Sequence, residues 1–363
     1  MKQTEERCFS MARNNYLIFL ASCLLIGLYG FIWHAQPANT PKARLSEYGF
    51  FTGTLADLSP ASRVFEYEVN APLFTDYAEK KRLIYLPEGS VMKFDNEKAF
   101  DFPTGAVLIK NFYYSNDVTD TSAGRKILET RLLIREREGW NALTYVWNEE
   151  QSDALLEVAG ATLSATWTDK KGKKTTFDYV VPNTNQCKGC HSYDGQFVPI
   201  GTTARQLHRT EKGQNQLLFW QKEGILETPS DFQLQTIQPL FDYRLIDRPE
   251  DANHQNLDSA ARAYLEGNCA HCHNTHGPAS TSGMFLEAGQ RNMEHVGVGK
   301  PPVAAGRGSG NRKYGIVPGK PGESILYFRM ESSDPGIRMP ELGRQLPHKE
   351  GMALIKQWIK AMR

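Results

Sequence analysis

Two copies of the pattern Cys-x-x-Cys-His, at residues 187–191 and 269–273, constrain this chain more than any other feature of its 363 residues. Two cysteines three positions apart lie on one turn of a helix, so both sulfurs can reach the two vinyl groups on one edge of a haem. The histidine directly after them would then lie beneath the ring and bind the iron. Each copy therefore predicts one covalently attached haem c. The predicted attachment residues are Cys187, Cys190, Cys269 and Cys272, and the predicted iron ligands are His191 and His273.

The spacing of the two segments argues against two other uses of paired cysteines. A zinc site built from two Cys-x-x-Cys pairs needs four thiolates that converge on one ion. Nearly eighty residues separate the pairs, which is long for a zinc ribbon, and the repeated histidine would be unexplained. A redox-active disulfide would explain one pair, but not two pairs that are each followed by histidine. Two covalently attached haem c groups with their iron remain the expectation.

Two predicted helices enclose the second segment. Asp258 can cap a short helix over residues 259–267, which runs into Cys269. Near the C-terminus, apolar residues at helical spacing predict a second helix. A helix that runs into Cys-x-x-Cys-His, together with a C-terminal helix that crosses it, resembles a class I cytochrome c domain. The apolar stripe of the C-terminal helix is Met352, Ile355, Ile359 and Met362, with Trp358 beside it.

A methionine between these helices is the predicted sixth ligand of the second iron. Met339 is followed by Pro340 shortly before the last helix, and this pair resembles the distal ligand loop of class I cytochromes c. Met330 and Met284 are the alternatives, and otherwise they pack against the haem edge or the core. His271, inside the second segment, is expected to point away from its iron.

The first segment has no comparable ligand. No methionine occurs in the chain between the two segments. A helix is predicted over residues 203–224, and the histidine that it carries, His208, is the preferred sixth ligand of the first iron. The alternatives are His254, a residue from another region such as Met92, or water.

Residues 45–182 are predicted to form a β-rich domain. Seven runs with period-two or β-branched patterns are separated by turn signals, and no helix is expected between them. Such a series indicates an antiparallel β-sandwich or barrel, followed here by a mostly α-helical region with two haem sites. No histidine lies between His34 and His191, which argues against an imidazole metal site in this domain. The runs are residues 64–69, 82–86, 106–114, 127–135, 143–147, 162–168 and 175–181.

The N-terminal segment predicts export from the cytoplasm. Residues 16–33 contain no charge and follow basic residues, so residues 16–34 are expected to be an uncleaved membrane anchor or, as the alternative, a removed signal peptide. This leaves the rest of the chain outside the cytoplasm. The expected division is a cytoplasmic tail (1–15), the membrane segment (16–34), a linker (35–44), the β-rich domain (45–182), a first haem region (183–256) and a class I cytochrome c-like domain with the second haem (257–363).

Beyond the two pentapeptides, the chain resembles an uncharacterised bacterial family of dihaem c-type cytochromes with a β-rich N-terminal region. The resemblance implies two haems bound through the cysteines and histidines named above, and an extracytoplasmic location. It is carried by residues 45–51, 70–78, 181–191, 264–273, 301–310 and 338–344.

These observations predict a periplasmic electron carrier, tethered to the inner membrane, that passes electrons between redox partner proteins. One alternative is a dihaem enzyme of the peroxidase type, in which the first haem has an open site. Another is that the β-rich domain binds a glycan or a partner protein while the haems deliver electrons. The formal net charge of +1, from 42 basic and 41 acidic residues, removes the usual argument for a nucleic-acid partner.

Overall fold

The computed structural model of this protein describes residues 40–118, 120–169, 171–211 and 213–363. Residues Ala43–Arg363 form one compact unit. The predicted cytoplasmic tail and membrane segment, residues 1–15 and 16–34, lie outside the described residues, as does the first half of the predicted linker, residues 35–39. Of the helices in the described part of the chain, none combines the length and the apolar character needed to cross a membrane.

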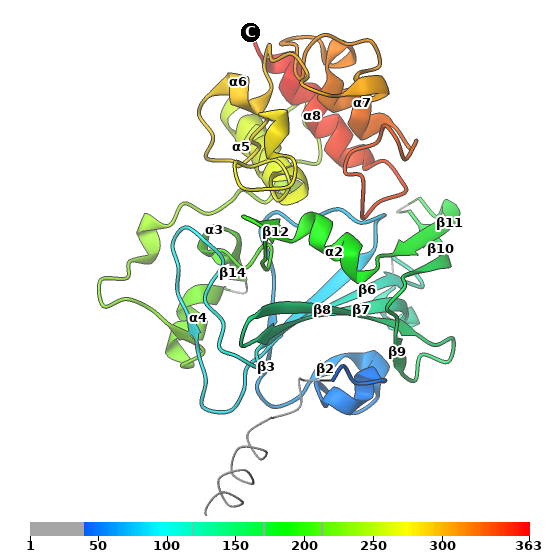
Figure 1. The fold of residues 1–363 in the computed structure, drawn as a ribbon, viewed down its shortest axis with the longest axis vertical. Helices are drawn as coiled ribbons and strands as arrows, with labels where there is room; N and C mark the ends of the chain where they lie inside the picture. The colour runs from blue at the N-terminus through cyan, green and yellow to red at the C-terminus, as the bar shows by residue number, and fades with distance from the viewer. Residues whose placement is uncertain (1–39, 119, 170, 212) are drawn as a thin grey trace, which may run out of the picture. The chain divides into compact units, whose positions relative to one another are not determined.

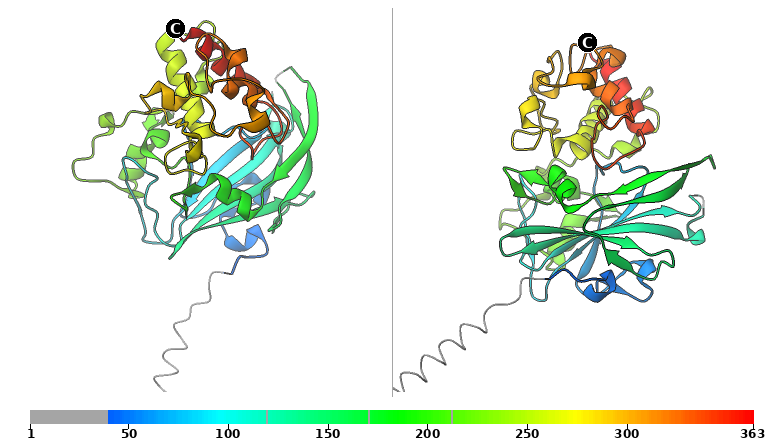
Figure 2. Two further views of the ribbon diagram at one scale, coloured as in Figure 1. Left: turned by 45° about the horizontal axis from the view of Figure 1, so that its top comes forward. Right: turned by 45° about the vertical axis from the view of Figure 1, so that its right-hand side comes forward.

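A six-stranded antiparallel sheet forms the centre of the unit (Figures 1 and 2). Its strand order is β3-β4-β6-β7-β8-β9, so each strand pairs with its sequence neighbours apart from the short β5. The period-two patterns explain this arrangement, because alternate residues of each strand point to opposite faces. The strands are β3 (Val64–Tyr67), β4 (Glu79–Tyr85), β6 (Val107–Ser115), β7 (Arg125–Glu136), β8 (Gly139–Trp147) and β9 (Ala154–Leu156).

The remaining strands form separate pairs. All seven predicted strand runs are present, which confirms an antiparallel β-rich N-terminal region, but the last two form a hairpin of their own beside the six-stranded sheet. The described strands thus make one large sheet with small attachments. The pairs are β10 (Ala161–Thr168) with β11 (Lys174–Val181), β1 (Phe51–Thr52) with β2 (Ser59–Pro60), β12 (Ser192–Tyr193) with β13 (Gln196–Phe197), β14 (Thr210–Glu211) with β15 (Gln214–Asn215), and the parallel β5 (Met92–Lys93) with β16 (Leu226–Glu227).

The two faces of the large sheet are covered by different parts of the chain. On one face, Leu83, Ile109 and Leu132 pair across β4, β6 and β7 and are packed by the N-terminal residues Leu45 and Leu58. The opposite face is covered at one end by α3 (Ala204–Leu207) and α4 (Gln216–Lys222) and at the other end by the β10–β11 hairpin. Helix α2 (Thr184–Cys190) packs on β8 and lies between the sheet and the C-terminal helices (Figure 1).

The region after the sheet is more helical, as predicted. One expected helix is wrong, because residues 203–224 form two short helices that flank the β14–β15 hairpin. Gly213 has a φ of +79° in the turn of that hairpin, a conformation that a continuous helix excludes. The helices are α2 (Thr184–Cys190), α3 (Ala204–Leu207), α4 (Gln216–Lys222), α5 (His254–Leu265), α6 (Met293–Val296), α7 (Ile325–Glu331) and α8 (Lys349–Ala361).

Helices α5 and α8 pack against each other, which confirms the predicted helix pair around the second segment. The predicted cap is wrong: α5 begins earlier, at the cap Asn253, whose side chain accepts from the backbone N–H of Asn256 at 2.8 Å. Asp258 instead accepts a hydrogen bond from the indole N–H of Trp358 on α8, at 2.8 Å. At Gly351 the α8 backbone runs directly against the ring of Tyr264, and a Cβ atom at this position would overlap that ring.

Candidate functional site

Helix α2 presents both cysteines of the first segment. The side chain of Asn183 accepts from the Gln186 N–H while the Gln186 side chain accepts from the Asn183 N–H, so a capping box starts the helix two residues after β11. Cys187 and Cys190 lie on the last turn, and the backbone N–H of His191 donates to the carbonyl of Cys187 at 3.0 Å. The structure thus confirms that the two cysteines share one helical turn.

The imidazole of His191 is held by the hairpin that follows it. Asp194 and Gly195 have φ values of 49° and 72°, which form the tight turn between β12 and β13 and bring Val198 back to the histidine. The Nδ1 of His191 lies 2.8 Å from the carbonyl oxygen of Val198, and the ring stacks on Phe197 with centroids 5.1 Å apart. Because a carbonyl can only accept, Nδ1 carries the proton and the lone pair of Nε2 stays available for a metal. Burial lowers the pKa of His191 to about 4, so the ring is neutral at pH 7.

The second segment follows α5 through a π-turn at Glu266–Ala270, which carries Cys269. The Nδ1 of His273 lies 3.2 Å from Ser282 Oγ, and that hydroxyl donates to the carbonyl of Ala279 at 2.7 Å. Since the serine proton is used there, Ser282 Oγ accepts from the Nδ1–H of His273, and Nε2 again keeps its lone pair. Burial lowers the pKa of His273 to about 4.

A cleft beside Cys269 contains the predicted sixth ligand of the second iron. Met339 lines this cleft together with Met330 and Met352. Met284 lies elsewhere, because its backbone N–H donates to Ser282 Oγ on the Nδ1 side of His273. The structure therefore brings Met339 and Cys269 together in one cleft, with Met330 as the neighbouring thioether.

Arg344 holds the loop that carries Met339. Its guanidinium is buried, and Nη2 lies 2.9 to 3.1 Å from the carbonyl oxygens of four residues in and before that loop. Nε lies 3.1 Å from the carbonyl of Met339 as well. The four residues whose carbonyls accept from Nη2 are Arg329, Met330, Ser332 and Met339.

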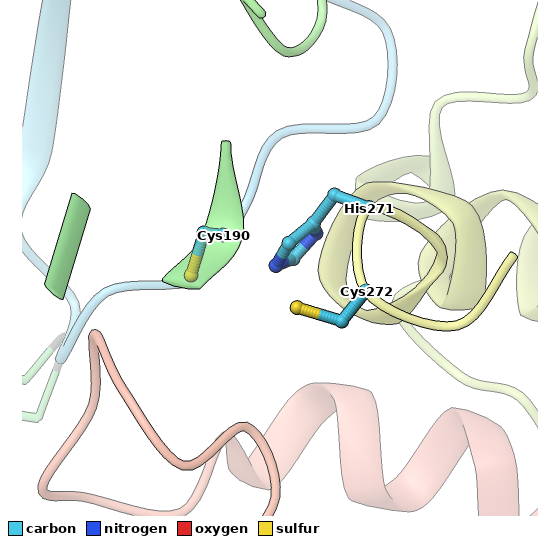
Figure 3. Close-up of side chains that lie close together, drawn as sticks. All are labelled: Cys190, His271 and Cys272. Carbon is cyan, nitrogen blue, oxygen red and sulfur yellow. The ribbon is translucent and has the colours of Figure 1, made fainter. Parts of the chain in front are cut away.

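The two segments meet at their second cysteines. The Sγ atoms of Cys190 and Cys272 and a ring nitrogen of His271 all lie within 4.8 Å of one another, and the three side chains point toward a common centre (Figure 3). We call these three residues the junction. Nearby, His276 Nδ1 lies 2.8 Å from a carboxylate oxygen of Asp194, so a second contact also joins the two segments. His271, expected to point away from its own iron, faces the cysteine of the other segment, which the spacing within one motif does not predict.

The junction is the one group of three or more His, Cys, Asp and Glu residues arranged for a metal ion among the residues that the structure describes. The hydrogen bond from Cys272, with a second from His271, lowers the pKa of Cys190 to about 4, while the pKa of Cys272 is raised. Cys187 and Cys269 lie outside the group, so the four cysteines do not converge as a four-thiolate zinc site requires.

The candidates for the sixth ligand of the first iron lie in three different places. His208 is at the C-terminal end of α3, with Nδ1 2.9 Å from the carbonyl of Ile237, which leaves Nε2 as a possible ligand atom. His254 is exposed at the start of α5. Met92 is fully buried in an apolar cluster with Phe100 and Trp220, so core packing accounts for it. The identity of this ligand stays a prediction.

The donor set of both segments fits a c-type haem. Each segment offers two half-buried thiols, and each has a neutral imidazole whose Nδ1–H already has an acceptor. Comparison of the chain with protein-family models, with curated proteins and with solved structures finds no match.

Proposed function

We propose that this protein is an extracytoplasmic dihaem c-type cytochrome that transfers electrons between redox partner proteins. The observation that carries the proposal is the same in both segments: the histidine after the cysteine pair donates its Nδ1–H to an oxygen within the protein and keeps Nε2 free. Metal-binding histidines almost always have this arrangement, because the second hydrogen bond fixes the tautomer and the ring orientation.

The residues would have the following roles. Cys187 and Cys190 would hold the first haem, with His191 as an iron ligand and His208 as the preferred second one. Each haem iron supplies one-electron redox chemistry when bound, and the protein orients the ligand atoms and excludes water. Cys269, Cys272, His273 and Met339 would hold the second haem, and the family resemblance and the α5–α8 pair both favour this assignment.

The junction supports electron transfer between the two sites. Cys190 belongs to the first attachment pair and Cys272 to the second, and their sulfur atoms lie within 4.8 Å of each other. Both haems would therefore be attached at neighbouring points of one compact unit. Electrons could pass between the sites without a change in protein conformation.

The different ligand sets should separate the two potentials. A methionine ligand at the second iron raises its reduction potential, whereas a histidine or an open position at the first leaves that potential lower. The location is proposed from the uncharged segment at residues 16–33 and from the family resemblance, both of which favour attachment of the haems outside the cytoplasm.

The experiment is a visible spectrum of the purified full-length protein with covalent haem quantified per chain. Two haems per chain are expected, with a methionine-to-iron charge-transfer band that Met339→Ala removes. Met293→Ala is the matched control, because Met293 is an exposed residue of α6. A colourless protein, or one haem per chain, would overturn the proposal.

A second candidate function follows from the junction itself. Two thiols and one imidazole within 4.8 Å form a soft donor set that suits Zn²⁺. This function requires that Cys190 and Cys272 are not bound to haem, so the two proposals exclude each other. Metal analysis of colourless protein would show about one zinc per chain, and His271→Ala would lose it.

A further inference from the structure

One face of the large sheet carries a row of three cations. Arg82 on β4 pairs directly with Lys110 on β6, and Lys110 pairs directly with Arg131 on β7. Lys80 lies two residues before Arg82 and therefore faces the same side of the sheet. We call Lys80, Arg82, Lys110 and Arg131 the cationic band.

The band interrupts a face that is otherwise apolar. On one side of it, Ile84 and Leu108 pack against α3 and α4, and on the other side Phe112 and Tyr114 pack against the β10–β11 hairpin. Like charges directly opposite each other on neighbouring strands destabilise a sheet. A row of cations at this place therefore needs a compensating interaction.

Carboxylates of the protein compensate the two arginines but not the two lysines. Glu68 lies 2.9 Å from Arg82, and the fully buried Glu129 pairs with Arg131 through Nε at 2.9 Å. Among the described residues, no carboxylate lies within salt-bridge distance of Lys80 or Lys110. The nearby Asp76 already accepts the backbone N–H groups of Gln345 and Leu346, at 2.7 Å each.

The two lysines are half-buried and electrostatically unfavourable as cations. Burial and the charges of Arg82 and Arg131 lower the pKa of Lys110 to about 7, and burial lowers the pKa of Lys80 as well. A cation that its own surroundings destabilise in this way is stabilised when an anion binds beside it.

The first segment lies close to this band. Helix α2 packs on β8, the strand next to β7, and carries Cys187 and Cys190. The charge of Arg131 acts on Cys187, and that of Lys110 acts on Cys190. At the β4 end of the band, Lys80 and Arg82 line a cavity of about 490 Å³. Its wall also includes the arginines Arg209 and Arg244 and the carboxylates Glu68, Glu79 and Glu211. The band thus extends from near the attachment helix to this cavity.

We propose that the cationic band binds the propionate carboxylates of the haem attached at Cys187 and Cys190. The inference rests on the proposed function. A haem carries two propionates, and the band carries two cations without a salt-bridge partner among the described residues. The band would thereby hold the first haem against the sheet and raise its reduction potential, because a nearby cation destabilises the ferric iron more than the ferrous iron.

The test is a redox titration of full-length holoprotein with Lys110→Gln. We expect Lys110→Gln to hold two haems per chain and to lower the reduction potential of the first haem alone. The equilibrium constant for reduction of that haem should fall threefold to tenfold, and a tenfold fall corresponds to 59 mV for one electron. The methionine-to-iron band identifies the second haem. Lys110→Arg should restore the wild-type potential. Lys81→Gln is the matched control. Lys81 lies between Lys80 and Arg82 on β4, but it faces the other side of the sheet and pairs with Glu66.

The outcomes of this titration and of a phosphate control separate the inference from the proposed function. If both variants hold two haems and the potential of the first haem is the same in Lys110→Gln as in Lys81→Gln, the inference is overturned and the proposed function stays intact. A colourless wild-type protein would instead overturn the proposed function. If Lys110→Gln loses haem, Lys80→Gln provides the same titration. Inorganic phosphate, added at constant ionic strength, should leave the melting temperature of the holoprotein unchanged. A phosphate-dependent increase that Lys110→Gln abolishes would show that the band takes a free anion, and would overturn the inference.

Discussion

Replacement of Arg344 by leucine should destabilise the fold and release the loop that carries Met339. The buried guanidinium is shared among the carbonyls of Arg329, Met330, Ser332 and Met339. Nη2 has two hydrogens and Nε has one, so about three hydrogen bonds serve these four carbonyls. Leucine fills part of the volume but donates none of them.

The size of the effect follows from these bonds. A hydrogen bond from a charged donor contributes about 1.5 to 3 kcal/mol, and the cost of burying the guanidinium offsets part of the sum. We expect a loss of about 3 kcal/mol in the free energy of unfolding. For a unit of about 320 residues the unfolding entropy is about 0.7 kcal/mol per kelvin, so the melting temperature should fall by about 4 to 5 °C.

Thermal unfolding followed by circular dichroism measures this loss, and the methionine-to-iron band of the holoprotein measures the position of Met339. We expect both signals to decrease in Arg344→Leu. The control is Arg248→Leu, because Arg248 is exposed and makes only surface ion pairs, so its replacement should change stability by less than about 0.5 kcal/mol. A melting temperature and a charge-transfer band that are both unchanged in Arg344→Leu would refute the reasoning.

Three further predictions follow from other contacts. Gly351→Ala places a Cβ against the ring of Tyr264 and should cost about 1 to 3 kcal/mol of unfolding free energy by chemical denaturation, whereas Gly322→Ala, where a Cβ meets open space, should not. Ser282→Ala removes the acceptor of the His273 Nδ1–H, which would make the imidazole a weaker electron donor to ferric iron. A redox titration should therefore show a higher potential for the second haem. An unchanged potential would contradict this role of Ser282. Burial lowers the pKa of His348 to about 3, below its value in the unfolded chain, so its contribution to stability is complete above about pH 6.5 and is lost as the pH falls toward 3. His348→Phe, which keeps the stacking on Phe74, should therefore weaken the fall in unfolding free energy between pH 6.5 and 4.5, by up to about 1.4 kcal/mol per pH unit. Urea denaturation at each pH measures this fall, and an equally steep fall in the variant would argue against the prediction.

The parts of the fold that depend on local patterns could be predicted from the sequence. Period-two runs placed the strands, and the three-residue spacing placed Cys187 and Cys190 on one helical turn. The first residue of α5 could not be predicted in this way, because Asn253 and Asp258 are both good N-cap residues. Only the hydrogen bond from the Trp358 indole to Asp258, a tertiary contact, distinguishes them. Sequence alone therefore does not determine where a helix begins when two nearby residues can each act as its N-cap.

The meeting of the two segments could not be predicted in this way. Cys272 Sγ lies 3.5 Å from the carbonyl oxygen of Gly189, a residue 83 positions away, and the contact depends on how α2 lies between the sheet and the C-terminal helices. The cationic band could not be predicted from the sequence either. Lys110 and Arg131 become neighbours only through the pairing register of β6 and β7, which a pattern within one strand does not determine.

Residues 70–78 connect the β-rich region with the helical region and bear on what the sheet is for. The backbone N–H of Phe74 donates to Asn268 at 2.7 Å, beside the second segment, and Asp76 accepts from the backbone of Gln345 and Leu346. The Cα of Gly267 approaches the carbonyl of Ala71 so closely that no side chain fits between them. An isolated β-rich domain would lose these contacts and expose to water the surface that they bury. The sheet is therefore better understood as one wall of the proposed haem housing than as a separate binding module attached to an electron carrier.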